Sequence, residues 1–286
     1  MKCFYHTDMD GHCAGAIVRR AMKNKEDDGT GFEYIAINYN HNFPFDKIRP
    51  NEEVVIVDFS PQKDGDFDRL LSITKRVVWI DHHKTAIEKH AHLSAQIAGI
   101  RRDGTAGCEL AWEYYYPYAS VPVIVQLLGD YDVWAFRYGE DTNKLQAGIR
   151  LYGSTNPESS NWDKWLNPGY LPKEEIKAGE VALTYRDNYY AGLIKSWSFW
   201  TEFEGYKVIA CNAGSVSSQL FDSIKEDYDL MMPFIFDGKK WTVSIYTKKD
   251  IDCSALAKKY GGGGHKQAAG FQCNSLPFTI TQEDTY

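Results

Sequence analysis

The chain has 286 residues, which is enough for two domains of ordinary size. A hydrophobic share of 43% and a charged share of 25% exclude a disordered or fibrous protein. The formal net charge of −7 argues against a protein that coats long nucleic acid. A small anionic substrate stays compatible with this charge, because bound metal ions neutralise a carboxylate-rich site.

Two further features bear on the location of the protein. No apolar stretch reaches the length of a membrane span, and residues 1–6 turn polar too early for a signal peptide. The six cysteines are scattered without a C-x-x-C pair, which indicates reduced, buried thiols and neither disulfides nor a zinc site. We therefore expect a cytoplasmic protein that does not associate with membranes.

The first half of the chain alternates strand-like and helix-like stretches. Strands are predicted at 2–6, 33–37, 53–58 and 76–81, and helices at 15–23, 67–75 and 105–116. Two of these strands, 53–58 and 76–81, are almost entirely apolar, as expected for parallel strands that are covered on both faces. The pattern predicts an α/β fold with an N-terminal doubly wound parallel sheet, whose ligands bind beyond the carboxyl ends of the strands.

The second half begins with a change in composition. Residues 153–172 are rich in Asn, Ser, Pro, Gly and Trp and are predicted to form a loop, after which Pro172 opens a long helix to about Ile194. Strands are then predicted at 198–203, 206–211, 230–236 and 241–246, with a hairpin turn at Asp237-Gly238 and a helix at 254–260. These elements divide the chain into a first domain (1–155), a linker of loop and helix (156–195) and a smaller α/β domain (196–286).

The first candidate site follows the first predicted strand, in the segment His6-Thr7-Asp8-Met9-Asp10-Gly11. In an extended backbone residues two apart point to the same side, so His6, Asp8 and Asp10 could converge on one point. Carboxylate oxygens with an imidazole suit Mn²⁺ or Mg²⁺, and the nitrogen ligand favours Mn²⁺. The alternative is a solvated turn or cap, which a D-x-D segment after a strand often forms.

Polar residues also follow the two apolar strands. Asp58 closes the strand 53–58 at the ligand-binding edge of the sheet, although it could equally be a turn or N-cap residue. Asp81, His82 and His83 follow the strand 76–81, where unpaired imidazole and carboxylate groups are costly to keep. We assign His82 as a metal ligand, Asp81 as a ligand or an orienting group, and His83 as a contact to substrate phosphate. The alternative is a structural histidine pair.

Two later segments complete the candidate site. Asp130 or Asp132, after the apolar run 121–128, could supply a last carboxylate, and the sequence does not decide between them. Near the end, four glycines at 261–264 precede His265 and Lys266. Consecutive glycines expose backbone N–H groups to a phosphate, and His265 and Lys266 add positive donors, whereas the alternative is a flexible loop.

The order H-x-D-x-D-G, strand-end Asp, D-H-H, later Asp and G-G-G-H-x-x-A-A-G-F resembles the DHH phosphoesterases that carry a DHHA1 domain. That family includes RecJ-type exonucleases, oligoribonucleases and cyclic-dinucleotide phosphodiesterases. The resemblance runs from His6 to Phe271 and so covers nearly the whole chain. It implies that the first domain is a DHH catalytic, metal-binding domain and that the last is a DHHA1 substrate-binding domain.

The resemblance also implies roles for individual residues. It implies two divalent cations, Mn²⁺ or alternatively Mg²⁺, held by His6, Asp8 or Asp10, Asp58, His82 and Asp130, and it leaves open which residue completes the first metal. It implies substrate contact by His83 and by Gly262, Gly263, Gly264 and His265. From the residues themselves we further expect catalytic roles for Asp81 and His83 and substrate binding by Lys266. Several members place a second carboxylate where this chain has His12, so His12 is a further candidate for a ligand or a substrate contact.

The expected reaction is hydrolysis of short single-stranded oligonucleotides or dinucleotides to nucleoside monophosphates by a two-metal mechanism. One alternative is a phosphoesterase for cyclic dinucleotides, for linear dinucleotides or for 3′-phosphoadenosine phosphate. The alternative from another class is a non-catalytic nucleotide sensor on the same scaffold. The sequence leaves open the choice of RNA or DNA, the polarity and length preference, the pathway and the oligomeric state, for which a homodimer is one option.

Overall fold

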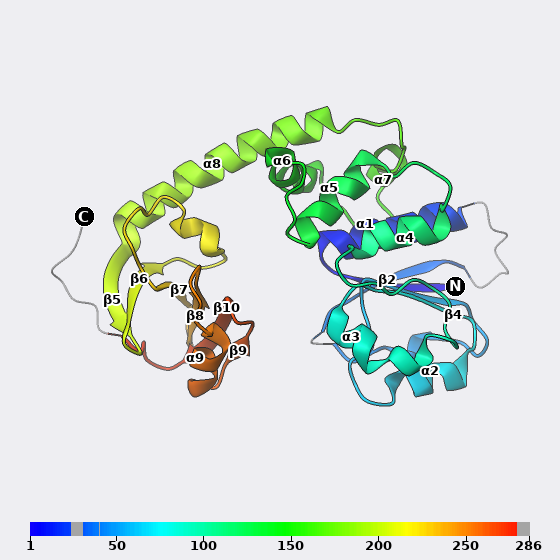
Figure 1. Cartoon of the computed structure of the whole chain (residues 1–286), viewed down its shortest axis with the longest axis horizontal. Coiled ribbons are helices and arrows are strands. Elements are labelled where there is room, and N and C mark those ends of the chain that lie inside the picture. The colour runs from blue at the N-terminus through cyan, green and yellow to red at the C-terminus, as the bar shows by residue number, and fades with distance from the viewer. Residues whose placement is uncertain (24–30, 40, 279–286) are drawn as a thin grey trace. The chain divides into compact units, whose positions relative to one another are not determined.

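A computed structural model describes residues 1–23, 31–39 and 41–278, which fall into two compact units, Met1–Leu183 and Thr184–Tyr286 (Figure 1). The helix α8 (Lys173–Trp197) begins in the first unit and ends in the second. Each unit has its own sheet and its own apolar core. The three-part division at residues 155 and 196 remains a prediction. Within the described ranges, the structure contains no helix with the length and apolar character of a membrane span.

The first unit is built on a four-stranded parallel sheet with the strand order β2-β1-β3-β4. The strands are β1 (Lys2–His6), β2 (Glu33–Ile37), β3 (Val54–Val57) and β4 (Val77–Ile80). All four residues of β3 are fully buried, as the apolar run in the sequence predicts for a central parallel strand. The predicted doubly wound α/β fold is therefore confirmed.

Helices cover both faces of this sheet (Figure 1). Helices α1 (Met9–Met22), α4 (Gly107–Tyr115) and α5 (Val123–Asp132) contribute to one core together with Cys3, Tyr5 and Val57. Helix α2 (Asp66–Ile73) packs into the other core with Phe4 and Trp79, and α3 (Lys84–Lys89) lies on the same side. Residues of β1 alternate between the two cores because successive strand side chains point to opposite faces.

Several parts of the first unit differ from the sequence prediction, including α3 and α5, which were not predicted as helices. Helix α1 begins at Met9 and not at Gly15, because the Asp8 carboxylate caps it by accepting a hydrogen bond from the Gly11 N–H at 2.8 Å. Helix α7 (Asn161–Trp165) lies inside the segment predicted as a loop, and its two tryptophans are buried in the core. Helix α6 (Glu140–Gly148) was not predicted, because its sequence is mostly polar.

The second unit contains a six-stranded mixed sheet with the strand order β5-β6-β7-β8-β10-β9. The strands are β5 (Ser198–Phe203), β6 (Tyr206–Asn212), β7 (Leu230–Phe236), β8 (Trp241–Tyr246), β9 (Gly263–Gly264) and β10 (Ala268–Cys273). Helix α9 (Cys253–Lys259) contributes to the core on one face of the sheet, and α8 contributes to the core on the other. The β7–β8 hairpin confirms the predicted turn, in which the Asp237 carboxylate accepts hydrogen bonds from two backbone N–H groups. The predicted smaller α/β domain is therefore confirmed.

Helices α6 and α8 approach each other through their backbones. A Cβ atom at Gly148 would lie 1.8 Å from the Glu175 carbonyl oxygen, and a Cβ atom at Gly179 would lie 1.7 Å from the Lys144 carbonyl oxygen. The Glu175 side chain, fully buried beside this crossing, accepts a hydrogen bond from the Trp165 indole N–H at 2.8 Å. Only glycine permits this contact, because any side chain at either position would separate the helices.

We expect Gly179→Ala to lower the free energy of unfolding of the first unit by about 1–3 kcal/mol, because the new methyl group overpacks the crossing. Gly192→Ala is the matched control in the same helix. A Cβ atom at Gly192 meets nothing within 4 Å, so this change should stabilise α8 by about 0.5–1 kcal/mol through helix propensity. Urea unfolding followed by circular dichroism measures both. Equal effects of the two substitutions would contradict the close crossing.

Candidate metal centre

Polar side chains follow three neighbouring strands at the carboxyl edge of the parallel sheet. His6 ends β1, Asp58 follows β3, and Asp81 to His83 follow β4. Because these strands are parallel and in register, their ends meet. The His82 Nε2 atom lies 3.1 Å from Asp58 Oδ1, and the His6 Nδ1 atom lies 3.7 Å from Asp58 Oδ2. The structure therefore brings together His6, Asp58 and His82, as predicted.

Asp58 lies at the centre of this cluster, and its carboxylate is buried without a hydrogen bond of good geometry. Its residue is fully buried, yet neither carboxylate oxygen has a hydrogen-bond partner among the described residues. Its backbone is left-handed (φ 54°), which Asp tolerates better than most residues. Burial raises the pKa of this carboxyl group well above its usual range. A buried carboxylate without a hydrogen bond of good geometry is costly, and a bound cation would compensate it.

The two carboxylates of the H-x-D-x-D segment reach the cluster by a route that the sequence did not predict. The backbone is helical from Met9 onward, so the prediction of an extended segment with its side chains on one side was wrong. Asp8 is the N-cap of α1, and its Oδ2 atom lies 2.8 Å from His6 Nδ1. Asp8 therefore combines the alternative role of a helix cap with a place in the cluster.

Asp10 lies in the first turn of α1, where it is almost completely buried. Its carboxylate accepts hydrogen bonds from the Gly107 and Cys108 backbone N–H groups, at 2.7 and 2.8 Å, at the N-terminus of α4. A Cβ atom at Gly107 would lie 2.8 Å from Asp58 Cβ and 2.9 Å from Asp10 Oδ2. Helix α4 thus holds Asp10 through backbone donors, and glycine at position 107 keeps space for both carboxylates.

Asp132, and not Asp130, joins the cluster. The Asp132 Oδ2 atom lies 3.4 Å from His82 Nε2. Asp130 is fully buried elsewhere and accepts hydrogen bonds from Arg137 Nε at 2.9 Å and from the Thr142 hydroxyl at 2.6 Å. Both aspartates belong to α5, and residues two apart on a helix point in different directions. The structure therefore does not bring the predicted ligand Asp130 into the cluster.

Within the described part of the chain, the side chains form three groups whose ligand atoms lie within 4.8 Å of one another. The groups are His6, Asp8 and Asp58; Asp10, His82 and Asp132; and Asp58, His82 and His83. Carboxylate oxygens mixed with imidazole nitrogens form a donor set for Mn²⁺ and similar divalent ions. Together with the unpartnered oxygens of Asp58, this donor set fits the expected binding of divalent cations.

The charges within the cluster depend strongly on one another. Burial and the nearby Asp10 carboxylate raise the pKa of Asp132 to about 7. Burial alone would lower the pKa of His6, but the carboxylates of Asp58 and Asp8 raise it to about 10. The side chains therefore retain protons that cations would displace on binding.

Asp81 and His83 form a pair beside the cluster. The Asp81 Oδ1 atom accepts hydrogen bonds from the His83 ring Nδ1 at 2.7 Å and from the His82 backbone N–H at 2.8 Å. Asp81 therefore orients His83, which was one of its two predicted roles. The Tyr39 hydroxyl lies 3.0 Å from His83 Nε2. Tyr39 was not predicted, although its position just after the edge strand β2 could have identified it.

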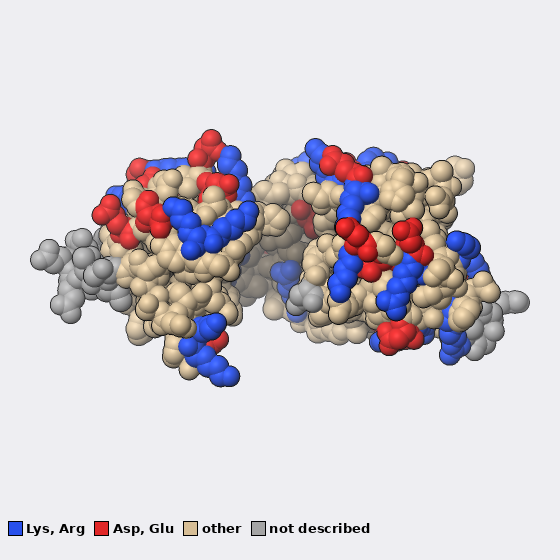
Figure 2. Space-filling model, turned by 90° about the horizontal axis from the view of Figure 1, so that it is seen from below, with Lys and Arg blue, Asp and Glu red and all other residues tan. Residues whose placement is uncertain are grey.

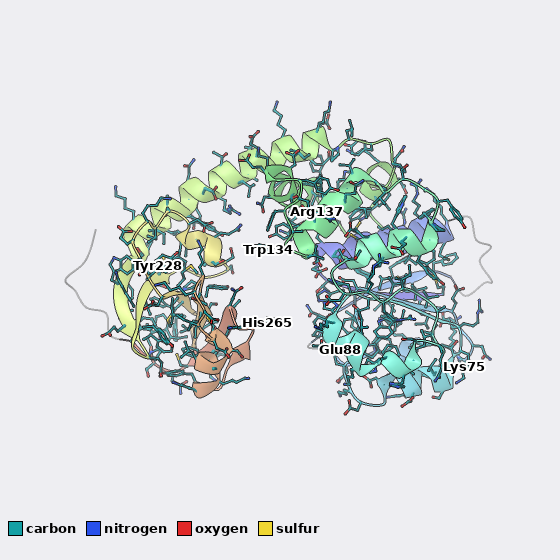
Figure 3. All side chains as sticks on the ribbon, in the orientation of Figure 1. Lys75, Glu88, Trp134, Arg137, Tyr228 and His265 are labelled. Carbon is teal, nitrogen blue, oxygen red and sulfur yellow. The ribbon has the colours of Figure 1, made fainter. Side chains whose placement is uncertain are left out.

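Three other residues of the predicted site belong to none of these candidate metal-binding groups. The His12 Nδ1 atom lies 3.0 Å from the Thr155 hydroxyl, and His12 is in none of the three metal-binding groups. In the second unit His265 is exposed (Figure 3), and Lys266 forms an ion pair with Asp250 at 2.5 Å.

The glycine segment of the second unit is ordered as part of the sheet. Gly263 and Gly264 form β9, which pairs with β10, so this segment is not a simple flexible loop. A Cβ atom at Gly262 would lie 2.1 Å from the Gly270 carbonyl oxygen, which explains one glycine by close backbone approach. Gly262 also lines a surface cavity of 460 Å³ together with Lys240 and Thr242. The substrate-binding role of Gly262, Gly263, Gly264, His265 and Lys266 remains a prediction.

We expect Asp58→Asn to stabilise the protein in EDTA by about 1–3 kcal/mol, because it removes a buried negative charge that the nearby carboxylates of Asp8 and Asp132 repel. Asn also tolerates the left-handed backbone at this position. The same substitution should abolish the rise in melting temperature that Mn²⁺ causes in the unaltered chain. Differential scanning calorimetry with and without Mn²⁺ measures both effects, and the exposed Asp103→Asn is the control. A normal Mn²⁺ response in Asp58→Asn would remove Asp58 from the site.

Two protein-family models and one curated relative match the sequence of this chain. Residues 3–129 match the DHH family, N-terminal domain, and residues 206–281 match the DHHA1 domain. An uncharacterized protein of Acanthamoeba polyphaga mimivirus is 25% identical over 254 residues, which cover 84% of this chain. The chain spans 57% of the length of that curated relative.

Solved structures of low sequence identity share the fold. The pGpG-specific phosphodiesterase PggH from Vibrio cholerae is 13% identical with a TM-score of 0.51, over 96% of this chain and 92% of that one. Exonuclease RecJ bound to manganese is 14% identical with a TM-score of 0.52, over 94% of this chain and 84% of that one. A DHH domain described as belonging to a family of ribosomal proteins is 16% identical with a TM-score of 0.58, over 94% of this chain and 81% of that one. The two matched domains, in this order and on this fold, show that the chain belongs to the DHH family and carries a DHHA1 domain.

Proposed function

We propose that this chain is a metal-dependent phosphodiesterase that hydrolyses short oligonucleotides to nucleoside monophosphates. The observation that carries the proposal is the fully buried carboxylate of Asp58, which makes no hydrogen bond of good geometry among the described residues and lies between the imidazoles of His6 and His82. A structural carboxylate at such a position would have hydrogen-bond donors, as Asp130 has. The arrangement is therefore suited to holding cations rather than to stabilising the fold.

The ligand groups suggest how two cations would be held. We assign His6, Asp8 and Asp58 to one cation, and Asp10, His82 and Asp132 to the other. Asp132 replaces Asp130 in this assignment because Asp130 is committed to Arg137 and Thr142. Divalent cations at this site would supply a Lewis acid for the phosphoryl group and would lower the pKa of a water molecule. Mn²⁺ suits these ligands best, and Mg²⁺ is the alternative.

His83 is the residue that we assign to the substrate. Asp81 holds its Nδ1 atom at 2.7 Å and so fixes the direction in which Nε2 points. Nε2 of a protonated His83 can donate a hydrogen bond to a phosphoryl oxygen and so stabilise the negative charge that develops there. The Tyr39 hydroxyl lies 3.0 Å from this atom. Asp81 acts through His83, as a positioning residue.

In the second unit we assign substrate binding to Gly262, Gly263, Gly264, His265 and Lys266. His265 and Lys266 are exposed, and the imidazole and ammonium groups can donate to a phosphate. Gly263 and Gly264 lack side chains, which allows a ligand to approach the backbone there. Binding a phosphate in this way would restrict the orientation of the ligand.

The charge pattern favours short substrates. The net charge is −7, and on the face shown in Figure 2 Lys and Arg side chains lie among Asp and Glu side chains on both units. The Arg101 guanidinium donates to backbone carbonyl groups, and Arg102 pairs with Glu113. A binding track for long nucleic acid would need many basic groups free to contact phosphates. Similarity in fold to a pGpG-specific phosphodiesterase supports a linear dinucleotide as the alternative substrate.

A substrate panel tests this proposal. With Mn²⁺ present, we expect release of nucleoside monophosphates from pApA and from a five-nucleotide RNA, and much slower cleavage of a long single strand and of cyclic di-AMP. Chromatography of the products measures each rate. His82→Ala, which removes a ligand, should lower the rate by at least about 100-fold because the developing charge loses electrostatic stabilisation. Absence of turnover with Mn²⁺ or Mg²⁺ would favour the non-catalytic nucleotide sensor.

The two aspartates of α5 provide a matched pair of variants. We expect Asp132→Asn to fold normally but to bind one Mn²⁺ fewer and to lose activity, because this carboxylate completes the second ligand group. Asp130→Asn should keep the Mn²⁺ stoichiometry but lower the free energy of unfolding by about 1–3 kcal/mol, because it weakens buried charge-assisted hydrogen bonds. Isothermal titration with Mn²⁺ and thermal melting separate the two. The reverse pattern would restore Asp130 as the ligand.

A further inference from the structure

The segment that follows α5 contains two bulky residues in an unfavourable backbone conformation. Trp134 (φ 56°) and Phe136 (φ 49°) both have a left-handed backbone, which is unfavourable for bulky side chains. Trp134 also leaves 63% of its surface exposed to solvent, so its burial does not compensate this cost. Strain of this kind in the backbone is found mainly at functional sites.

Asp130 holds this strained segment in place. Its carboxylate accepts hydrogen bonds from the Arg137 backbone N–H at 3.0 Å and from Arg137 Nε at 2.9 Å, and its carbonyl oxygen accepts one from the Ala135 N–H at 3.0 Å. The Trp134 N–H in turn donates to the Tyr131 carbonyl oxygen at 3.1 Å. The buried Asp130 therefore fixes the turn on which Trp134 is displayed, and Figure 3 labels Trp134 and Arg137 on this segment.

Two aromatic rings support the exposed indole. The Trp134 ring lies 5.3 Å from the Tyr131 ring at an interplanar angle of 69°, and 4.7 Å from the Phe136 ring at 78°. Edge-to-face pairs of this kind are favourable and restrict the motion of the ring. Trp134 is thus held in one orientation while most of its surface remains accessible.

The position of Trp134 in the chain connects it with the metal centre. Asp132, two residues earlier, lies 3.4 Å from His82 in the ligand cluster. Two residues span at most about 7 Å of chain, which is within the reach of one nucleotide from its phosphate to its base. On the basis of the function proposed above, we infer that Trp134 is the stacking platform for the base of the nucleotide whose phosphate occupies the metal centre.

This inference predicts how the site selects its substrate. Stacking on an indole uses the face of a base, which every base offers, so the platform should accept all four bases with small differences in affinity. It should discriminate strongly against a nucleotide that lacks its base. Asp130 and Arg137 would then act as positioning residues for Trp134, without touching the substrate themselves.

Two substrates test the inference in kinetic measurements. One is pApA, and the other is an analogue of pApA that lacks the base of the nucleotide whose phosphate is expected at the metal centre. We expect Trp134→Ala to raise the KM for pApA by about 5- to 100-fold, with little change in kcat, because it removes one stacked base. The analogue should have the same KM with Trp134→Ala as with the unaltered protein. Trp134→Phe should recover part of the affinity. Trp134→Gly should have an unchanged or higher melting temperature, because glycine relieves the strained backbone.

Tyr118→Ala is the matched control, since Tyr118 is a fully exposed aromatic residue in the same unit and belongs to none of the ligand groups. It should leave both kinetic constants unchanged. An unchanged KM in Trp134→Ala would overturn the inference while leaving the proposed hydrolysis intact. A loss of Mn²⁺ affinity in Trp134→Ala would also overturn it, because Trp134 would then act by supporting Asp132. If the unaltered protein hydrolyses no substrate with Mn²⁺ or Mg²⁺, the proposed function itself fails.

Discussion

The organisation of the first unit depends on one buried carboxylate at the edge of a parallel sheet. The Asp58 carboxylate makes no hydrogen bond of good geometry among the described residues, although ring nitrogens of His6, His82 and His83 lie 3.7, 3.1 and 3.9 Å from its oxygens. A carboxylate in this position is costly to fold, and its backbone is left-handed as well. The apolar burial in the rest of the sheet must offset this unfavourable free energy. The fully buried strand β3 and the apolar cores on the two faces of the sheet provide that burial.

Helix termini complete the centre around this carboxylate. Asp8 caps α1, and Asp10 in its first turn accepts hydrogen bonds from the N-terminal N–H groups of α4. These donors partly compensate two of the negative charges, so that several carboxylates can share a small volume. The remaining charge is left for a cation. Glycine at position 107 is required for this arrangement, because a side chain there would displace Asp58 and Asp10.

The two aspartates of α5 show how neighbouring residues of one type can serve different purposes. Asp130 has its hydrogen bonds satisfied within the protein and holds the strained turn after the helix. Asp132 lies 3.4 Å from His82, and burial and the Asp10 carboxylate raise its pKa. The fully satisfied aspartate stabilises the fold, whereas the incompletely satisfied one belongs to the candidate metal centre. The chain's relatives of known structure share the fold at 13–16% identity, so the substrate must be inferred from residues such as these.

The sequence by itself determined the strands β1 to β8, the helical segment that became α8 and the meeting of His6, Asp58 and His82. The physical reason is that a buried parallel strand needs an apolar run, and the carboxyl ends of such strands share one edge. Only the tertiary structure decided the early start of α1, the helices α6 and α7, the choice of Asp132 over Asp130 and the contact of Tyr39 with His83. These depend on the direction of side chains on a helix and on partners far away in the chain, which neither local propensity nor spacing records.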